Sequence, residues 1–291
     1  MNKIAFFTDS CVDILPEDIK KYDIHVIPFT VSVGEKSYLD GIDITNKEVW
    51  KLMSEGHILP KTAAGSPSDY SKAWKPFLDD GYEIIHCGIG AHLSNGFNAA
   101  RIAKDYLKSD NIHIVDSNNL SAAIGMLILK GVVLKEKDMS AEYIANKMSN
   151  LSKHISSQFT VDDLEFLFKG GRCSGMSYLF SKALKIHPVL KTYADGFLRM
   201  QTKIRGHIEK ACDFMLDEMK GKLEYIDKSS LTIIDVDNEE ASNYLVSKVK
   251  EIIPDAKIYI TRAGSIISCH CGPGTIGLMY FTKEEYRESE E

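Results

Sequence analysis

Apolar runs of strand length alternate with stretches of helical periodicity along the first half of the chain. Residues 3–7, 82–87 and 112–115 are such runs, and each leads through small or hydroxylated residues into a helical pattern. We expect the longer helices at residues 67–78, 97–107, 119–137 and 140–151. Strands and helices that alternate in this way indicate a parallel sheet covered by helices, in which ligands gather at the carboxyl ends of the strands.

Turn and capping residues divide the region between the first two of these strands. Residues 24–33 are predicted to be extended, and Gly34 begins a turn that returns the chain as a hairpin. A helix capped by Thr45 follows. Residues 60–67 are expected to form a loop of small residues, with Ser66 as the N-cap and Pro67 as the first position of the next helix.

The pattern changes after about residue 152, where strands become more frequent. Asp195-Gly196 is a strong hairpin signal between strands at 187–193 and 197–203. Further strands are expected at 156–161, 231–236, 257–261 and 275–281, with helices at 207–219 and 239–252.

The sequence thus predicts an α/β protein of two domains. Residues 1–153 form a parallel α/β/α sheet domain, and residues 154–283 form an α/β domain with a mixed sheet. Residues 284–291 are rich in Glu and are expected to be a disordered tail.

Length and composition place the chain among ordinary globular proteins. Its 291 residues are enough for two medium domains, and 44% hydrophobic with 26% charged residues is a common balance. A net charge of −6 and the lack of a basic patch argue against a nucleic-acid partner. With no signal peptide and no apolar run of the roughly 18 residues that span a bilayer, we expect a cytoplasmic protein whose cysteines are free thiols.

Residues 269–277 hold the densest group of reactive and conformationally unusual side chains. Cys269, His270 and Cys271 are all potential metal ligands, and a turn rich in glycine follows them. If residues 266–271 are extended, His270 points away from the two cysteines, so the three cannot share one ion. The remaining cysteines stand alone, whereas structural zinc needs a second pair of ligands. No metal site is therefore expected, and a closing strand is predicted to present His270.

Two other motifs allow more than one interpretation. Residues 88–93 have the start of a dinucleotide fingerprint, but its third glycine is missing. Ser94 follows at an expected helix N-terminus, where it is either a plain N-cap or a donor to an anion. A hydrolase would use Ser94 as its nucleophile and His270 as its base, oriented by Asp9 or Asp116. The glycine that a nucleophile elbow needs before the serine is absent, so this alternative is weaker.

Together these motifs resemble one known family over essentially the whole chain up to residue 281. The chain is similar to DegV-family proteins in the order and spacing of Thr8-Asp9-Ser10, Pro60-Lys61-Thr62, Leu93-Ser94, Asp116-Ser117, Lys169-Gly170-Gly171-Arg172-Cys173-Ser174, Pro188-Val189-Leu190, Asp195-Gly196, Arg205, and His270 with Gly272-Pro273-Gly274. The resemblance implies a bacterial fatty-acid-binding protein, which is the lipid-carrying subunit of a fatty-acid kinase in phospholipid metabolism.

The resemblance also implies roles for individual residues. A fatty-acid ligand would lie between the two domains, with its carboxylate held by Thr62, Ser94, Arg205 and His270. Arg172 would contact a phosphate or the partner. The acyl tail would be buried among apolar residues, and the candidates, which ordinary core packing explains equally well, are Leu164, Met176, Leu179, Phe180 and Ile186.

The expected partner supplies the chemistry. The chain lacks a Gly-x-x-x-x-Gly-Lys-Ser/Thr loop and an acidic metal cluster, so we expect no catalytic residue and no cofactor of its own. ATP and Mg²⁺ would belong to the kinase, which converts the bound carboxylate to an acyl phosphate, and transient membrane contact would allow lipid exchange.

Alternatives from other functional classes stay open at this point. They are an acyl ester hydrolase that uses Ser94 and His270, and a lipid-binding sensor without a kinase. Ala63-Ala64-Gly65 and Asn95-Gly96 depart from the family pattern, which leaves the head-group geometry open. Acyl chain length, unsaturation, the identity of the kinase and the oligomeric state are not encoded in any motif of the chain.

Overall fold

The computed structural model describes residues 3–56, 58–172 and 185–283. The chain divides into two compact units, unit 1 with Met1–Ser152 and Ala263–Cys269, and unit 2 with Lys153–Arg262 and His270–Glu291. Ala263–Cys269 thus groups with the N-terminal part of the chain. The predicted division into residues 1–153 and 154–283 has a single boundary and does not include this grouping. The expected disordered tail, residues 284–291, lies outside the described residues.

A four-stranded parallel sheet forms the centre of unit 1, in the order β2-β1-β6-β7. Its strands are β1 (Ile4–Asp9), β2 (Ile24–Ile27), β6 (Glu83–Gly88) and β7 (Ile112–Asp116). All residues of β1 are buried, as expected for a strand inside a sheet that is covered on both faces. The parallel sheet predicted for the N-terminal part is confirmed.

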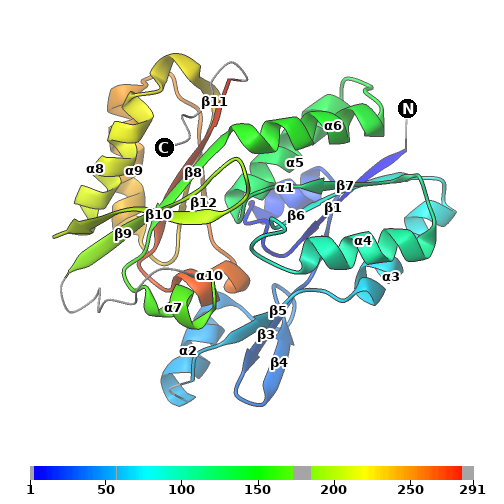
Figure 1. Cartoon of the computed structure of the whole chain (residues 1–291), viewed down its shortest axis with the longest axis horizontal. Coiled ribbons are helices and arrows are strands. Elements are labelled where there is room, and N and C mark those ends of the chain that lie inside the picture. Colours follow the sequence, from blue (N-terminus) through cyan, green and yellow to red (C-terminus); the bar gives the residue numbers. More distant parts are fainter. Residues whose placement is uncertain (1–2, 57, 173–184, 284–291) are drawn as a thin grey trace. The chain divides into compact units, whose positions relative to one another are not determined.

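Helices cover both faces of this sheet, as Figure 1 shows. They are α3 (Pro67–Asp79) and α4 (Gly96–Leu107) on one face, with α5 (Ala122–Lys135) and α6 (Ala141–Leu151) on the other. The short α1 (Pro16–Lys21) follows β1. α5 is apolar around most of its circumference and buried over most of its length, which fits a helix that packs on both the sheet and α6.

The start of α3 shows how local sequence places a helix. Ser66 Oγ accepts a hydrogen bond from the Asp69 amide at 3.3 Å, and the Ser66 amide donates to the Asp69 carboxylate at 2.8 Å. Pro67 takes the first helical position, where its missing N–H costs nothing. The prediction for Ser66 and Pro67 is therefore confirmed, with Asp69 completing a capping box.

A second, three-stranded sheet of unit 1 has the order β4-β3-β5. It consists of β3 (Thr30–Val33), β4 (Lys36–Leu39) and β5 (Lys61–Ala63), with α2 (Asn46–Gly56) preceding β5 in the chain. The hairpin predicted at Gly34 is confirmed, since Val33 pairs with Lys36. The extended stretch predicted at residues 24–33 is confirmed, although it is divided between two sheets. The expectation of a loop at residues 60–67 is wrong in part, because residues 61–63 form a strand. This error concerns a pairing partner that is distant in sequence.

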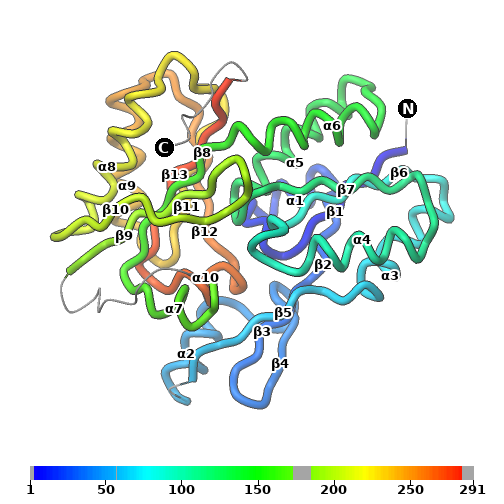
Figure 2. Tube along the Cα trace, viewed as in Figure 1, coloured from blue at the N-terminus to red at the C-terminus, as the bar shows by residue number. Residues whose placement is uncertain are grey.

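Unit 2 is built on a six-stranded mixed sheet in the order β10-β9-β8-β13-β11-β12. Figure 2 shows β13 running between β8 and β11, although it comes last in the chain. Only β11 and β12 pair in parallel among the strands described for this sheet. The strands are β8 (Ile155–Thr160), β9 (Ile186–Thr192), β10 (Leu198–Arg205), β11 (Ile226–Asp235), β12 (Ile258–Arg262) and β13 (Ile276–Thr282).

Two helices, α8 (Ile208–Lys220) and α9 (Glu239–Ile252), pack side by side against this sheet. Apolar side chains of both helices and of β9, β11 and β13 form the core between them, including Met215, Leu245 and Leu278, which are fully buried. The short α7 (Glu165–Lys169) follows β8. The mixed sheet and the hairpin at Asp195-Gly196 are as predicted.

The segment before the closing strand differs from the prediction. Residues expected to be extended form a helix, α10 (Ser265–Cys271), so the idea that a strand presents His270 is wrong. The periodicity of so short an apolar run does not distinguish a strand from a buried helix. The argument that His270 faces away from Cys269 and Cys271 therefore loses its premise. Among the described residues, no group of three or more His, Cys, Asp or Glu side chains is arranged to hold a metal ion.

Candidate functional site

The carboxyl end of β1 is tied to the end of β6 by a buried acid. Asp9 accepts hydrogen bonds from the amides of Ile89 at 2.8 Å and Cys11 at 3.0 Å. Asp9 is 1% exposed, and burial raises its pKa to about 6, although the hydrogen bonds from these amides lower it. Asp9 thus positions the start of the loop that leads to Ser94.

Ser94 lies in that loop, just before α4. Its Oγ accepts a hydrogen bond from the Gly96 amide at 3.3 Å, and its own amide donates to the Gly90 carbonyl at 3.2 Å. Asn95, rather than Ser94, is the N-cap residue of α4, and its side chain makes no capping hydrogen bond. The half-buried Ser94 hydroxyl therefore lies beside the first turn of a helix, where backbone N–H groups favour a negatively charged group.

Thr62 lies in β5, opposite Val31 of β3. The segment that follows Thr62 packs on the fully buried ring of Tyr70, because a Cβ on Gly65 would be 3.3 Å from that ring. The Tyr70 hydroxyl lies 3.1 Å from the place of a Cβ on Gly96, just after Ser94. The structure therefore brings the segments that follow Thr62 and Ser94 together on one tyrosine of unit 1.

In unit 2, the structure brings together His270, Gly170 and Arg172. The His270 imidazole lies so close over Gly170 that a Cβ there would be 3.0 Å from its Cε1. The Arg172 guanidinium donates to the Gly170 carbonyl at 2.6 Å. Burial, and after it the charge of Arg172, lowers the pKa of His270 to about 4. His270 is therefore neutral at pH 7 and offers a hydrogen bond rather than a charge.

Arg205 has a different place in unit 2. It is the last residue of β10, exposed, and pairs with Ile186 across the hairpin. The next residue, Gly206, adopts φ 125°, which a side chain would make unfavourable, and its amide donates to the Lys185 carbonyl at 2.8 Å. This turn sets the point at which the arginine side chain leaves the sheet.

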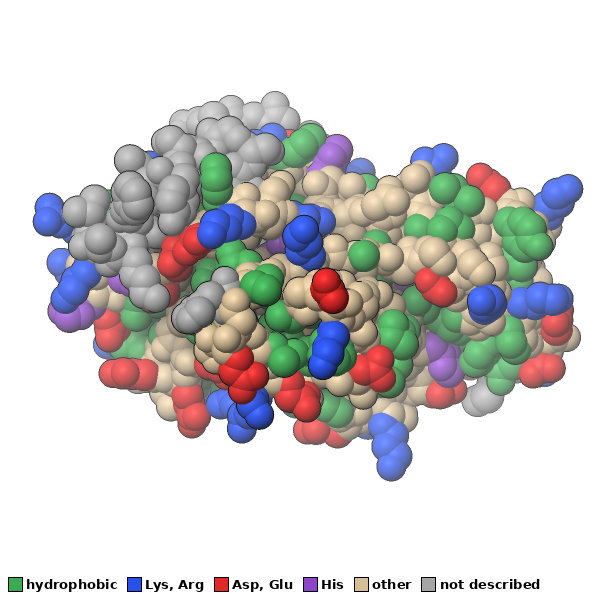
Figure 3. All heavy atoms as spheres, turned by 90° about the horizontal axis from the view of Figure 1, so that it is seen from below, with side chains coloured by type: hydrophobic (Ala, Val, Ile, Leu, Met, Phe, Trp, Pro, Cys, Tyr) green, Lys and Arg blue, Asp and Glu red, His purple; other side chains and the backbone are tan. Residues whose placement is uncertain are grey.

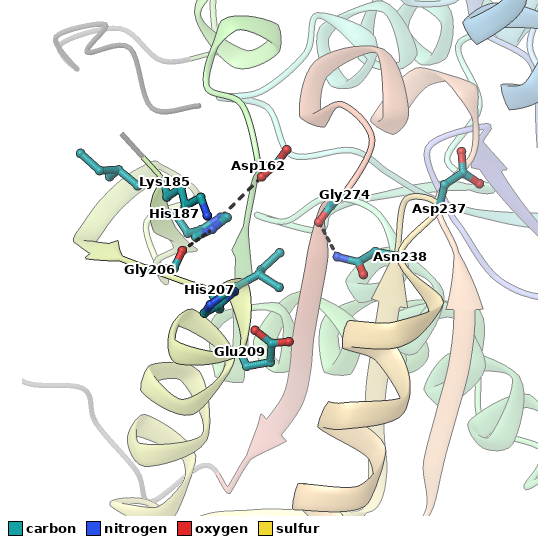
Figure 4. Close-up of a pocket in the computed structure, with 11 residues that line it drawn as sticks. Asp162, Lys185, His187, Gly206, His207, Glu209, Asp237, Asn238 and Gly274 are labelled. Atoms are coloured by element: carbon teal, nitrogen blue, oxygen red, sulfur yellow. Dashed lines mark hydrogen bonds and ion pairs between the residues drawn. The ribbon is translucent and has the colours of Figure 1, made fainter. Parts of the chain in front are cut away.

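A pocket of about 380 Å³ lies next to this turn (Figure 4). His187 Nε2 donates to the Gly206 carbonyl at 3.1 Å, and its Nδ1 lies 3.8 Å from the Asp162 carboxylate. On the other side, Asn238 donates to the Gly274 carbonyl at 2.7 Å, so the turn after His270 is held in place here. The lining is polar, with Asp162, Lys185, Ile186, His187, Gly206, His207, Ile208, Glu209, Asp237, Asn238 and Gly274.

Of the expected tail-pocket residues, two fall within the described part of the chain. Leu164 is buried at 4% exposure just before α7, and Ile186 is half-buried and lines the polar pocket. Met176, Leu179 and Phe180 lie outside the described residues.

The charges on the molecular surface show no strong bias on the face seen in Figure 3, where acidic and basic side chains of the described residues are interspersed. None of the described helices is both long and apolar enough to cross a bilayer.

Motif reasoning did not identify the buried acids Asp13 and Asp40, which hold the start of α10. No local signal marks them, because an acid in a loop is ordinarily a solvated charge. Only their burial, 7% exposed for Asp13 and 5% for Asp40, sets them apart.

Comparison with known proteins places the chain in a family. The family model described as "Uncharacterised protein, DegV family" matches residues 3–283. The chain belongs to the DegV family. A DegV domain-containing protein of Clostridium acetobutylicum is 32% identical to this DegV protein over 284 residues, which cover 97% of this chain and 100% of that one.

Solved DegV structures share the fold of this DegV protein. A DegV family protein from Thermus thermophilus, described by its fatty acid binding, has a TM-score of 0.88 and 25% identity, covering 96% of this chain and 99% of its own. DegV of Bacillus subtilis, described as a fatty acid binding protein, has a TM-score of 0.82 and 25% identity, covering 97% of this chain and 100% of its own. The two-domain α/β fold that the sequence predicts is confirmed.

Proposed function

We propose that this DegV protein binds a long-chain fatty acid. The observation that carries the proposal is the whole-chain likeness to the DegV proteins of T. thermophilus and B. subtilis, which are described as binding fatty acids. The residues that the family resemblance assigns to the carboxylate are of the types that such a ligand requires.

The carboxylate needs directional donors once it leaves water, and a positive charge strengthens them. Thr62 and Ser94 supply hydroxyl groups, and Ser94 adds the first turn of α4 beside it. His270 supplies a neutral imidazole, and Arg205 supplies the guanidinium charge. In this proposal all four side chains contribute to carboxylate binding, while Arg172, which lies beside His270, contacts a phosphate or the partner.

The acyl chain supplies most of the binding free energy. Burial of a 16-carbon chain gains about 0.8 kcal/mol per CH₂, or roughly 12 kcal/mol before the costs of association and ordering. This gain is large enough for the lipid to stay bound during purification. Among the described residues, Leu164 and Ile186 are the proposed contacts of the tail.

We further propose that the protein presents the bound fatty acid to a separate kinase. A carboxylate oxygen would attack the γ-phosphoryl group of ATP, which yields the acyl phosphate and ADP. The partner would supply ATP and Mg²⁺, because the chain carries no phosphate-binding loop of its own. The cytoplasm, where ATP is available, and brief contact with a membrane for lipid exchange belong to the same proposal.

Lipid analysis of the purified protein tests fatty-acid binding. Mass spectrometry under denaturing conditions is expected to release a fatty acid, and added palmitate is expected to raise the melting temperature of delipidated protein more than methyl palmitate does. Methyl palmitate is the matched control because it has the same tail without the charge. Absence of any lipid, together with no palmitate shift, would refute the proposal.

Two further assays separate the alternatives. Loaded protein, incubated with ATP, Mg²⁺ and a cognate kinase, is expected to yield acyl phosphate; tight binding without this product would leave a lipid sensor. Turnover of a chromogenic ester that Ser94→Ala abolishes would instead establish a hydrolase.

A further inference from the structure

The carboxyl group of Asp13 joins two distant segments of unit 1. Its Oδ1 accepts a hydrogen bond from the amide of Gly264 at 2.6 Å, immediately before α10. Its Oδ2 lies 2.6 Å from Ser121 Oγ, immediately before α5. Asp13 (φ 30°) and Ser121 (φ 60°) both have positive φ, a strained conformation for residues other than glycine that the surrounding structure must enforce. The contact is thus maintained against backbone strain.

Two further side chains of unit 1 hold the same end of α10. Asp40, which is 5% exposed, accepts hydrogen bonds from the amides of Ser265 and Ile266. Asn46 Nδ2 donates to Ser268 Oγ at 3.0 Å. The first amides of a helix have no partner within the helix, so Asp40 caps α10, while Asn46 ties the Ser268 hydroxyl to the start of α2. The start of α10 is therefore held in place by side-chain hydrogen bonds, and we call this set of contacts the anchor.

We propose that Asp13 is a positioning residue for fatty-acid binding: by holding Gly264 it fixes α10, the helix whose last turn carries His270. This inference rests on the proposed function, in which His270 binds the ligand carboxylate. His270 follows Gly264 within about two turns of one continuous helix, so a displaced start displaces the imidazole. Such a shift matters because a misplaced donor loses most of its hydrogen bond to the ligand.

The anchor is compatible with a protonated Asp13. A neutral carboxyl group still accepts from the Gly264 amide with one oxygen and from the Ser121 hydroxyl with the other. Burial, with smaller contributions from the carboxyl groups of Asp40 and Asp9, raises the pKa of Asp13 to about 8, although the hydrogen bonds from Ser121 and Gly264 lower it.

The neighbouring titratable groups also favour the protonated form of Asp13. Burial also raises the pKa values of Asp9, Asp40 and the Cys11 and Cys269 thiols, and all of these groups become negative when they ionise. Because the pKa of Asp13 in the folded protein lies above its ordinary 3.8, protonation favours the anchored state, and this advantage is lost as the pH rises through about 8. Binding that depends on the anchor should therefore weaken at alkaline pH.

Palmitate affinity at pH 6 and pH 9 tests the proposal in three forms of the full chain. Asp13→Asn has the shape of the neutral acid, so it should bind like the wild type at pH 6. Asp13→Ala removes both contacts and should bind about tenfold more weakly at both pH values. Between pH 6 and pH 9 the wild type should lose about tenfold in affinity, whereas Asp13→Asn should lose clearly less.

A control and a second readout separate positioning from general loss of stability. Asp235→Asn makes the same change at a buried acid of unit 2 that accepts from the Asn238 amide at 3.0 Å, and it should keep the pH profile of the wild type. Hydrogen exchange of the peptide 263–271 should be faster in Asp13→Ala than in the wild type, with no ligand present.

The outcomes are distinguishable. Unchanged affinity and unchanged exchange in Asp13→Ala would overturn the positioning role, and so would a pH profile of Asp13→Asn that matches the wild type. If Asp13→Ala does not fold, the pH dependence of palmitate affinity in Asp13→Asn tests the positioning role by itself. A wild type that binds no palmitate at either pH overturns the proposed function itself, and with it the role of Asp13 in binding, while exchange still reports the anchor.

Discussion

Replacement of Gly170 by alanine should displace the His270 imidazole. Gly170 ends α7 with φ −71° and ψ −9°, which alanine adopts readily, so the effect would be steric rather than a matter of backbone strain. The new Cβ would lie 3.0 Å from His270 Cε1, closer still to Nδ1, and 2.9 Å from the Phe166 carbonyl oxygen. Unstrained contacts of carbon need about 3.5 Å or more, so the ring has to move.

The size of the effect follows from the tightness of this contact. Overpacking of a close contact costs about 1–3 kcal/mol. In a unit of this size 1 kcal/mol lowers the melting temperature by roughly 4 °C, so a decrease of about 4–12 °C is expected. A lost hydrogen bond from His270 to the ligand carboxylate should weaken palmitate binding by about tenfold.

Thermal melting and palmitate titration of Gly170→Ala measure both effects. Gly221→Ala is the matched control, because Gly221 ends α8 with φ −62° and a Cβ there would meet neighbours only at an ordinary 3.6 Å. The control should melt and bind close to the wild type. If Gly170→Ala behaves like Gly221→Ala in both measurements, the packing of His270 over Gly170 is refuted.

Three further predictions concern single side chains. Burial, and after it the charge of Arg172, lowers the pKa of His270 from 6.5 to about 4, so on acidification the unfolded chain binds a proton at this residue before the folded protein does. The free energy of unfolding, measured by chemical denaturation, should therefore fall by up to about 3 kcal/mol between pH 6.5 and pH 4. In His270→Gln this contribution to the pH dependence should be missing. Arg205→Ala should weaken palmitate binding more than Arg172→Ala in isothermal titration, and equal small effects would contradict the carboxylate assignment. Ser66→Ala should lower the free energy of unfolding by about 1 kcal/mol through loss of its hydrogen bond with the Asp69 amide, and an unchanged denaturation midpoint would count against the cap.

Local signals predicted much of the fold. Ser66 and Pro67 mark a helix start, and Asp195-Gly196 marks a hairpin, because caps and tight turns satisfy backbone groups within a few residues of each other. Non-local pairing was harder to predict. Residues 61–63 become a strand only because β3 provides a partner about 30 residues earlier in the chain.

For the candidate site, too, local signals predicted one part and non-local packing decided the rest. Motif spacing singled out Thr62, Ser94 and His270, and the structure shows the segments after the first two meeting at Tyr70. Spacing also singled out Arg172, but its position beside His270 depends on the turn at Gly170. Asp13 and Asp40 carry no sequence signal, since what distinguishes them is burial by segments from elsewhere in unit 1.

The sequence by itself determined the α/β class, the change of pattern after residue 152 and the family of this protein, because these depend on short-range periodicity and on the spacing of motifs. Only the tertiary structure decided that residues 265–271 are a helix and that residues 263–269 group with unit 1. The physical reason is that the buried carboxyl groups of Asp13 and Asp40, more than 200 positions earlier in the chain, accept the hydrogen bonds of the amides that start this helix.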